Sequence, residues 1–120
     1  MSRTGPPPPP LSAQDRAAAA ARGVRARQMR AGLRAGLADG SLRIDEVLAR
    51  GTGDDEDGRI IARMRVVDLV SSFRGIGPVR AAGIMQDIGI AANRRVGGLG
   101  RRQVDSLIDV LGRRRGGGGA

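Results

Sequence analysis

The sequence has no cysteine and no histidine among its 120 residues. Without these two residue types the chain has no disulfide, no thiolate nucleophile and no imidazole base, and it lacks the usual protein ligands of zinc. The aspartates of the expected helices have surface spacing, with no base or nucleophile beside them. We therefore expect a protein that is not an enzyme, with no catalytic residue, no metal site, no cofactor and no small-molecule substrate.

Aromatic residues are almost absent, since Phe73 is the only one. Proteins that hold single-stranded nucleic acid usually stack the bases on aromatic side chains, so the composition favours a duplex over a single strand. Lysine is missing too, and all 21 basic residues are arginine. Arginine favours bidentate binding of phosphate and guanine, although coding in a GC-rich genome explains the same usage.

Long apolar runs are missing as well. No stretch approaches the roughly 18 residues that a transmembrane helix needs, and the N-terminus lacks the apolar core of a secretion signal. The formal net charge of +9 attracts polyanions. A chain of this length has room for one compact domain with flexible ends. These features predict a soluble cytoplasmic protein that binds nucleic acid and no membrane.

The composition divides the chain into four segments. Residues 1–11 end in a proline run and are expected to form a disordered tail. Residues 12–40 open with a capping-box pattern at Ser12 and continue as an arginine-rich helix. Because this helix has few bulky apolar residues to bury, we expect it to project as an arm or lid. Residues 41–112 are expected to form the core, and residues 113–120 are expected to form a flexible tail of arginine and glycine.

Apolar periodicity predicts an all-α core. A short helix is expected around Val47 and ends at Gly51. Residues 51–58 follow and are rich in glycine and acidic side chains. The spacing of a calcium-binding loop is missing from this acidic run, so we expect a solvated loop without a metal.

Three further amphipathic helices are expected in the second half of the chain. The first of them ends at Gly75. The second begins with Gly77 as its N-cap and Pro78 at the first helical position, and it ends at Gly89. The third ends at Gly112. The three helices share one apolar core.

The turn between the first two of these helices is Gly75-Ile76-Gly77. It fits the hairpin of helix-hairpin-helix modules. Glycine allows unusual backbone dihedral angles and a close approach of backbone amides to a phosphate, and these amides lie at the positive end of the next helix. The plainer interpretation is that the two glycines only join two helices.

The turn before the last helix contains a similar triplet, Gly98-Leu99-Gly100. Cations beside a helix N-terminus oppose the helix dipole unless an anion binds, so this turn predicts an anionic ligand. Two such turns can straddle one DNA groove. Four arginines flank the triplet: Arg94, Arg95, Arg101 and Arg102. Arg94 and Arg95 lie outside every apolar stripe, so no core role is expected for them.

These motifs resemble the actinobacterial integration host factors, which are nucleoid proteins with a helix-two-turn-helix fold. The likeness runs from Ala13 to Leu111. The resemblance implies a monomer that binds duplex DNA with little sequence preference, with the N-terminal helix as a lid near the minor groove. It also implies that the protein compacts the nucleoid by condensing DNA and that it supports site-specific recombination. Its most specific parts are Arg63-Met64-Arg65-Val66, the first turn with Val79-Arg80-Ala81, and Asn93-Arg94-Arg95-Val96 before the second turn.

The chain also departs from the pattern of this family. Pro78 and Gly97 stand where the family has basic residues. Arg74 stands where a proline is usual, and Arg101 and Arg102 replace small polar residues. Positive charge is thus lost and regained at different places, which indicates a divergent member.

The function predicted from the sequence is that of a nucleoid-associated architectural protein. It binds double-stranded DNA without sequence specificity and grips the phosphate backbone through two glycine-rich turns and their flanking arginines. The predicted DNA-binding residues are Arg63, Arg65, Arg74, Gly75, Ile76, Gly77, Pro78, Val79, Arg80, Arg94, Arg95, Gly98, Leu99, Gly100, Arg101 and Arg102.

Two other functions stay open at this point. The same two-turn module resembles part of a small-subunit ribosomal head protein that contacts RNA, so an RNA-binding role competes with the DNA-binding one. Helix-hairpin-helix folds also dock protein partners, so an interaction adaptor is the other alternative. Nucleic-acid binding weakens steeply with salt, whereas an apolar helix interface hardly responds, and this difference separates the two classes.

Overall fold

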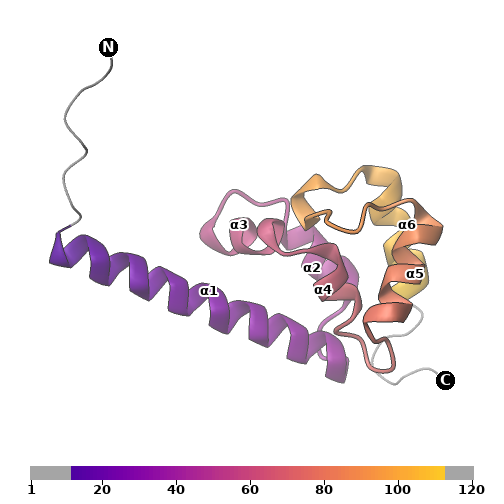
Figure 1. Cartoon of the computed structure of the whole chain (residues 1–120), viewed down its shortest axis with the longest axis horizontal. Helices are drawn as coiled ribbons and strands as arrows, with labels where there is room; N and C mark the ends of the chain where they lie inside the picture. The colour runs from indigo at the N-terminus through magenta and orange to yellow at the C-terminus, as the bar shows by residue number, and fades with distance from the viewer. Residues whose placement is uncertain (1–11, 113–120) are drawn as a thin grey trace, which may run out of the picture.

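The computed structural model describes residues 12–112, which form an all-α protein, as predicted (Figure 1). The tails predicted for residues 1–11 and 113–120 lie outside the described residues. None of the helices within residues 12–112 is long and apolar enough to cross a membrane. In chain order the elements are α1 (Ala13–Asp39), α2 (Ile44–Arg50), α3 (Glu56–Arg63), α4 (Val66–Val70), α5 (Pro78–Ile88), the 3₁₀ turn η1 (Val96–Gly98) and α6 (Arg101–Gly112).

Local chemistry sets both ends of α1. The Ser12 hydroxyl accepts a hydrogen bond from the Asp15 amide at 3.0 Å, and the Asp15 carboxylate accepts one from the Ser12 amide at 3.4 Å. This is the capping box predicted from the sequence. The helix ends at Gly40, whose φ of 84° is the left-handed conformation that favours glycine. Just before it, hydrogen bonds from the side chain and backbone of Ser41 lower the pKa of Asp39.

The prediction that α1 projects as an arm is wrong for its last turns. None of residues 13–32 is buried, and Figure 1 shows this part of α1 running past the shorter helices. Leu33 and Leu37, in contrast, are only 3% and 1% exposed and belong to the hydrophobic core. The absence of a side chain at Gly36 leaves room for Leu42, whose Cδ1 would lie 2.5 Å from a Cβ there. The low average hydrophobicity of the helix hides this short apolar end.

The solvated loop predicted for residues 51–58 is also only partly right, because α3 begins at Glu56. The Asp55 carboxylate caps this helix by accepting a hydrogen bond from the Gly58 amide at 2.9 Å. Acidic side chains are favourable in the first turn of a helix, so the charge run starts a helix while its side chains stay exposed. The helix then buries Ile61 completely in the core.

Helix α4 ends at Val70, earlier than the predicted end at Gly75. The Ser72 hydroxyl donates a hydrogen bond to the Asp68 carbonyl at 2.6 Å. Side-chain bonds of this kind give the backbone an alternative to the next helical turn. The chain therefore leaves the helix early, and residues 71–77 form the first turn of the two-turn module.

The boundaries predicted for the last two helices are confirmed. Helix α5 has Gly77 as its N-cap and Pro78 at its start, and it ends at Gly89 in the left-handed conformation with a φ of 90°. Helix α6 ends at Gly112. Residues 89–100 form the second turn, which contains η1.

One hydrophobic core joins all of these elements. Helix α1 packs on α3, α2 packs on α3 and α6, and α5 packs on α4 and α6. The core residues are Leu33, Leu37, Ile44, Val47, Leu48, Ile61, Met64, Val66, Leu69, Val70, Phe73, Ile76, Ala81, Met85, Ile90, Val96, Leu107 and Leu111.

Candidate nucleic-acid interface

A groove lies between α1 and the segment that runs from α3 to α4. Its outer part encloses about 340 Å³ and its inner part about 240 Å³. Ile60 and Arg63 line both parts, so the two form one surface, which we call the α1–α3 groove. Its charged lining is Arg22, Arg30, Arg34, Arg59, Arg63, Arg65 and Arg95 with Glu56 and Asp68.

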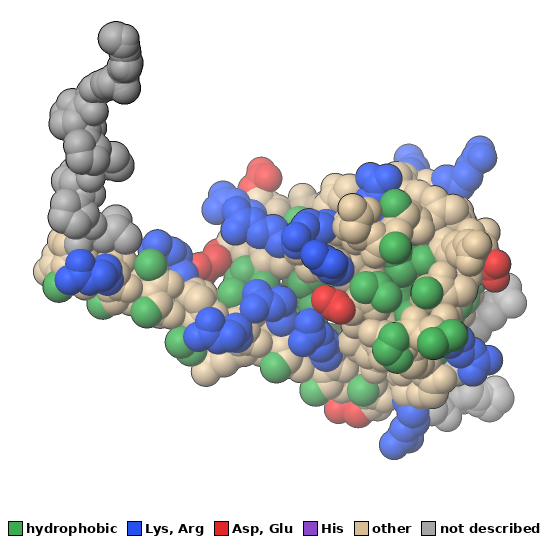
Figure 2. Space-filling view, in the orientation of Figure 1, with side chains coloured by type: hydrophobic (Ala, Val, Ile, Leu, Met, Phe, Trp, Pro, Cys, Tyr) green, Lys and Arg blue, Asp and Glu red, His purple; other side chains and the backbone are tan. Residues whose placement is uncertain are grey.

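Cations dominate this groove. Figure 2 shows arginines over α1 facing arginines over α3 and the segment after it, with apolar surface between them. Seven arginines against two carboxylates give the groove a strongly positive potential, and concave walls of low dielectric constant concentrate that potential. On α1 the arginines extend from Arg22 to Arg34, which is about 18 Å of helix. The groove therefore has the shape and the charge that suit an elongated anion.

Two ion pairs connect α1 to the opposite wall of the groove. Arg25 pairs with Glu56 of α3 at 3.3 Å, and Arg34 pairs with Asp68 of α4 at 3.7 Å. All four side chains are about half exposed. Exposed pairs of this kind contribute only about 0–1 kcal/mol each, so a phosphate can displace them at little cost.

The second turn is bonded to the segment between α3 and α4, which we call the strap (residues 64–65). The strap and the turn are about thirty residues apart in the sequence, yet Arg65 and Arg95 form an antiparallel bridge. Two backbone hydrogen bonds flank the bridge, from the Val66 amide to the Arg94 carbonyl at 2.9 Å and from the Val96 amide to the Met64 carbonyl at 2.9 Å.

The structure brings together three of the predicted DNA-binding arginines, since Arg63, Arg65 and Arg95 all line the α1–α3 groove. The Arg95 guanidinium donates a hydrogen bond to the Arg63 carbonyl at 2.6 Å, and Arg94 donates one to the Gly98 carbonyl at 3.3 Å. Both side chains are exposed and lie outside the core, but they also hold backbone carbonyls, a role that the sequence did not predict. The bond of Arg95 depends on the position of the strap beside the second turn, which no local sequence pattern shows.

The glycines of the second turn are needed for space. Gly89 at the start of this turn has a positive φ, but Gly97, Gly98 and Gly100 do not. A Cβ at Gly98 would lie 3.1 Å from the Arg94 Cδ, so the glycine makes room for that side chain. The Gly100 amide donates to the Gln103 side chain at 2.9 Å, and Leu99 is half-buried. Arg101 and Arg102 are exposed in the first turn of α6, where no acidic residue balances the helix dipole.

The first turn is built differently. Gly75 takes the left-handed conformation with a φ of 82°, but Gly77 is extended with a φ of −86°. The unusual dihedral angles predicted for both glycines therefore occur only at Gly75. A Cβ at Gly77 would meet no atom within 4 Å, so the space beside it is open to a ligand. The Ile76 side chain is 3% exposed and lies in the core, which leaves only its backbone available for binding.

The side chains around the first turn are exposed. Pro78 and Val79 lie on the surface, and Val79 is 88% exposed. Within residues 12–112, the side chains of Arg74 and Arg80 make no hydrogen bond or ion pair, and they do not line the α1–α3 groove. Helix α5, whose 11 residues span about 16 Å, separates this turn from the second one.

Four arginines of the groove were missed by sequence reasoning: Arg22, Arg30, Arg34 and Arg59. A partial signal exists, because Arg30 and Arg34 are four residues apart, as are Arg59 and Arg63, and this spacing puts each pair on one helix face. Choosing these faces requires knowing that α1 lies over α3.

Comparison with known proteins gives a consistent result. A family model described as "S13-like H2TH domain" matches residues 37–111. The integration host factor of Streptomyces coelicolor is 39% identical over 97 residues, which cover 81% of this chain and 87% of that protein. The integration host factor of Mycobacterium tuberculosis is 35% identical over 102 residues, which cover 85% of this chain and 93% of that protein.

A solved structure is similar as well. It is the structure of sIHF bound to an 8-bp palindromic DNA, with a TM-score of 0.70 and 34% sequence identity. The match covers 76% of this chain and 98% of that one.

Proposed function

This chain belongs to the actinobacterial integration host factor family, and from this premise we propose that it binds double-stranded DNA without strong sequence preference. Its role is that of an architectural protein of the nucleoid, acting as a monomer in the cytoplasm to condense DNA and support recombination. Family membership agrees with the expectation that the chain is not an enzyme.

The α1–α3 groove carries this proposal. Its seven arginines come from α1, α3, the strap and the second turn, so four segments present guanidinium groups to one ligand. The phosphate backbone supplies most of the affinity of non-specific DNA binding, and each neutralised phosphate releases condensed counterions. Guanidinium groups suit this task because each can hold two phosphate oxygens in one plane.

The two turns add further contacts in this proposal. Arg94, Arg101 and Arg102 flank the second turn beside the start of α6. The open space at Gly77 lets a phosphate approach the first turn of α5, whose backbone amides favour an anion. The buried position of Phe73, which is 4% exposed, leaves no aromatic platform for single-stranded bases among the described residues. A duplex is therefore the preferred ligand.

Duplex RNA is the second candidate ligand, and the S13-like description of the matching family model favours it. A-form RNA has a deep, narrow major groove and a different phosphate spacing, so a rigid clamp does not fit both duplexes equally well. Competition between DNA and RNA duplexes of the same sequence for the labelled protein decides between them. Stronger competition by DNA supports the proposal.

The central test is the double substitution Arg94→Ala and Arg95→Ala. We expect DNA binding to weaken about tenfold or more on every sequence tested, and the slope of log affinity against log salt to fall by about two. Replacing both residues by lysine restores the charge but only part of the affinity, because an ammonium group cannot grip two oxygens in one plane. Gel shifts over a salt series measure both effects.

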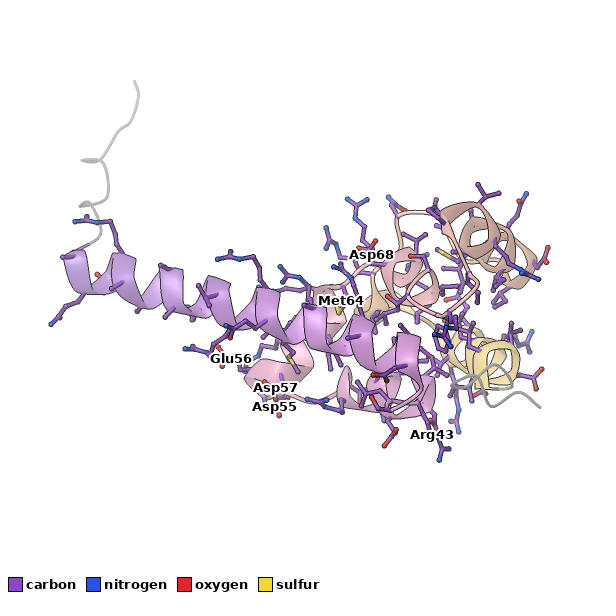
Figure 3. All side chains as sticks on the ribbon, turned by 90° about the horizontal axis from the view of Figure 1, so that it is seen from below. Arg43, Asp55, Glu56, Asp57, Met64 and Asp68 are labelled. Carbon is purple, nitrogen blue, oxygen red and sulfur yellow. The ribbon has the colours of Figure 1, made fainter. Side chains whose placement is uncertain are left out.

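Arg43→Ala with Arg50→Ala is the matched control, because it removes the same charge. Arg43 pairs with Asp45 at 2.7 Å and Arg50 with Asp57 at 3.4 Å, and neither arginine lines the groove. Figure 3 shows Arg43 and Asp57 on the opposite side of the molecule from Asp68. Equal weakening in both double variants would mean that binding follows net charge alone and that the proposed surface is wrong.

A further inference from the structure

One carboxylate lies among the arginines of the inner groove. Asp68 of α4 is the only acidic side chain in this part of the lining, beside five arginines. Its carboxylate lies 3.7 Å from the Arg34 guanidinium, and its side chain is 45% exposed. Figure 3 shows Asp68 on the same side of the molecule as Met64 of the strap. A negative charge therefore lies in the inner part of a surface proposed to bind phosphate.

The fold has little need of this carboxylate. The hydrogen bonds from the Ser71 and Ser72 hydroxyls, at 3.4 and 2.6 Å, go to the backbone carbonyl of Asp68, not to its side chain. The ion pair with Arg34 is half exposed on both sides and stabilises the fold little. A favourable interaction with the dipole of α4 is the plain structural role, but α4 has only five residues.

The same carboxylate has two consequences for an anionic ligand. It pairs with Arg34 and thereby occupies a cation that a phosphate would otherwise bind. It also repels phosphate oxygens from the α4 end of the groove, because like charges at close range destabilise each other. Both effects act against DNA binding and confine the backbone to the part of the groove away from Asp68.

We propose that Asp68 is a built-in competitor of DNA phosphate, which weakens binding and positions the backbone by holding Arg34. This inference rests on the proposed DNA-binding function. It assigns to this residue a tuning role, whereas the arginines around it supply the attraction.

The test is Asp68→Asn in the full chain, with a short mixed-sequence DNA duplex as the probe. We expect binding at low salt to tighten about two- to fivefold, since removing an exposed ionic competitor changes affinity by that order. The salt slope should steepen by about 0.9, because Arg34 becomes free to neutralise one more phosphate. Asp45→Asn is the matched control, since it removes an aspartate from the exposed Arg43 pair outside the groove. This control should leave affinity and slope nearly unchanged.

Introducing Asp68→Asn into a protein that already carries Arg34→Ala distinguishes competition for Arg34 from a general effect of charge. In Arg34→Ala protein the cation that Asp68 holds is gone, so adding Asp68→Asn should no longer steepen the salt slope. Thermal melts verify that each variant is folded, and Asp68→Ser makes the same charge change in a smaller side chain if the asparagine variant unfolds.

The outcomes are distinct. Tightening and a steeper slope in the Asp68 variant alone support the proposal. Equal behaviour of the Asp68 and Asp45 variants, or weaker binding by the Asp68 variant, overturns it while leaving DNA binding intact. Absence of DNA binding by the unaltered protein instead overturns the proposed function itself.

Discussion

Helix α1 and the second turn both contribute arginines to the α1–α3 groove. They differ in whether the side chains that line the groove also stabilise the fold. In α1 the two tasks lie on different side chains, because Arg22, Arg30 and Arg34 line the groove and do not belong to the core. Residues 13–32 are not buried, whereas Leu33 and Leu37 are core residues. In the second turn the same residue does both, because Arg95 lines the groove and also donates a hydrogen bond to the backbone of Arg63.

This difference determines what a mutation can reveal. Affinity and stability should separate in α1, where a cut between the outer and inner parts removes arginines without touching the core. They should change together at the second turn, because its bonds to the strap hold the groove in shape. The first turn is a further case, since Arg74 and Arg80 are exposed and have no bonds within the described residues.

The largest expected effect comes from shortening the N-terminus to two different lengths. Deleting residues 1–40 removes Leu33 and Leu37, and truncating a buried leucine costs about 2–5 kcal/mol each. A domain of this size has a total stability of about 5–15 kcal/mol, so this deletion should abolish the cooperative thermal transition. Deleting residues 1–26 should leave the transition in place but weaken DNA binding, because Arg22 leaves the groove.

Thermal melts and gel shifts on the two truncated proteins test the division within α1. Cooperative unfolding at the original temperature by the protein lacking residues 1–40 would contradict the core role of Leu33 and Leu37. DNA binding as strong as that of the full chain by the protein lacking residues 1–26 would contradict the binding role of the outer part of α1.

The features that the sequence predicted well are set by local chemistry. Gly77 and Pro78 begin α5, and Gly89 ends it, because each favours its backbone conformation at that point whatever lies nearby. The capping box at Ser12 is local in the same sense. The start of α3 was missed although its cap, Asp55, is local too, because a run of acidic residues is equally typical of a solvated loop.

The features that escaped prediction depend on tertiary neighbours. Leu33 and Leu37 enter the core because α1 packs on α3, and the pattern of residues within a polar helix does not predict that packing. The groove likewise depends on packing between segments that are distant in the sequence. Arg63, Arg65 and Arg95 were predicted from motifs, but their meeting depends on the bridge between the strap and the second turn. Arg34 of α1 was not predicted at all.

A smaller effect is expected from single substitutions on the two sides of that bridge. Arg95→Ala should lower the free energy of unfolding by about 1 kcal/mol, because the Arg63 carbonyl loses its hydrogen-bond donor. Arg65→Ala should leave it nearly unchanged, since Arg65 takes part in the bridge through its backbone. Both should weaken DNA binding to a similar degree, because both side chains line the groove.

Urea unfolding measures the free energy of unfolding of the two variants, and gel shifts measure their DNA affinity. Equal stabilities of the two variants would show that the Arg95 hydrogen bond contributes nothing to the fold. The second turn would then resemble the outer part of α1, and the contrast between the two regions would disappear.

The smallest effect on stability is expected at the first turn, from Arg74→Ala combined with Arg80→Ala. Neither side chain has a bond to lose within residues 12–112, and surface substitutions away from such features usually change stability by less than about 0.5 kcal/mol. DNA binding should nevertheless weaken several-fold and the salt slope should fall by about two, since each arginine is placed beside the open N-terminus of α5 to meet a phosphate. Melting curves and salt titrations of this pair, set beside those of the Arg43 and Arg50 control, distinguish two interfaces. A fall in slope like that of the second-turn variant means that the duplex contacts both ends of α5. A slope equal to that of the control means that the duplex is held by the α1–α3 groove and the second turn alone, and that the exposed first turn only joins two helices.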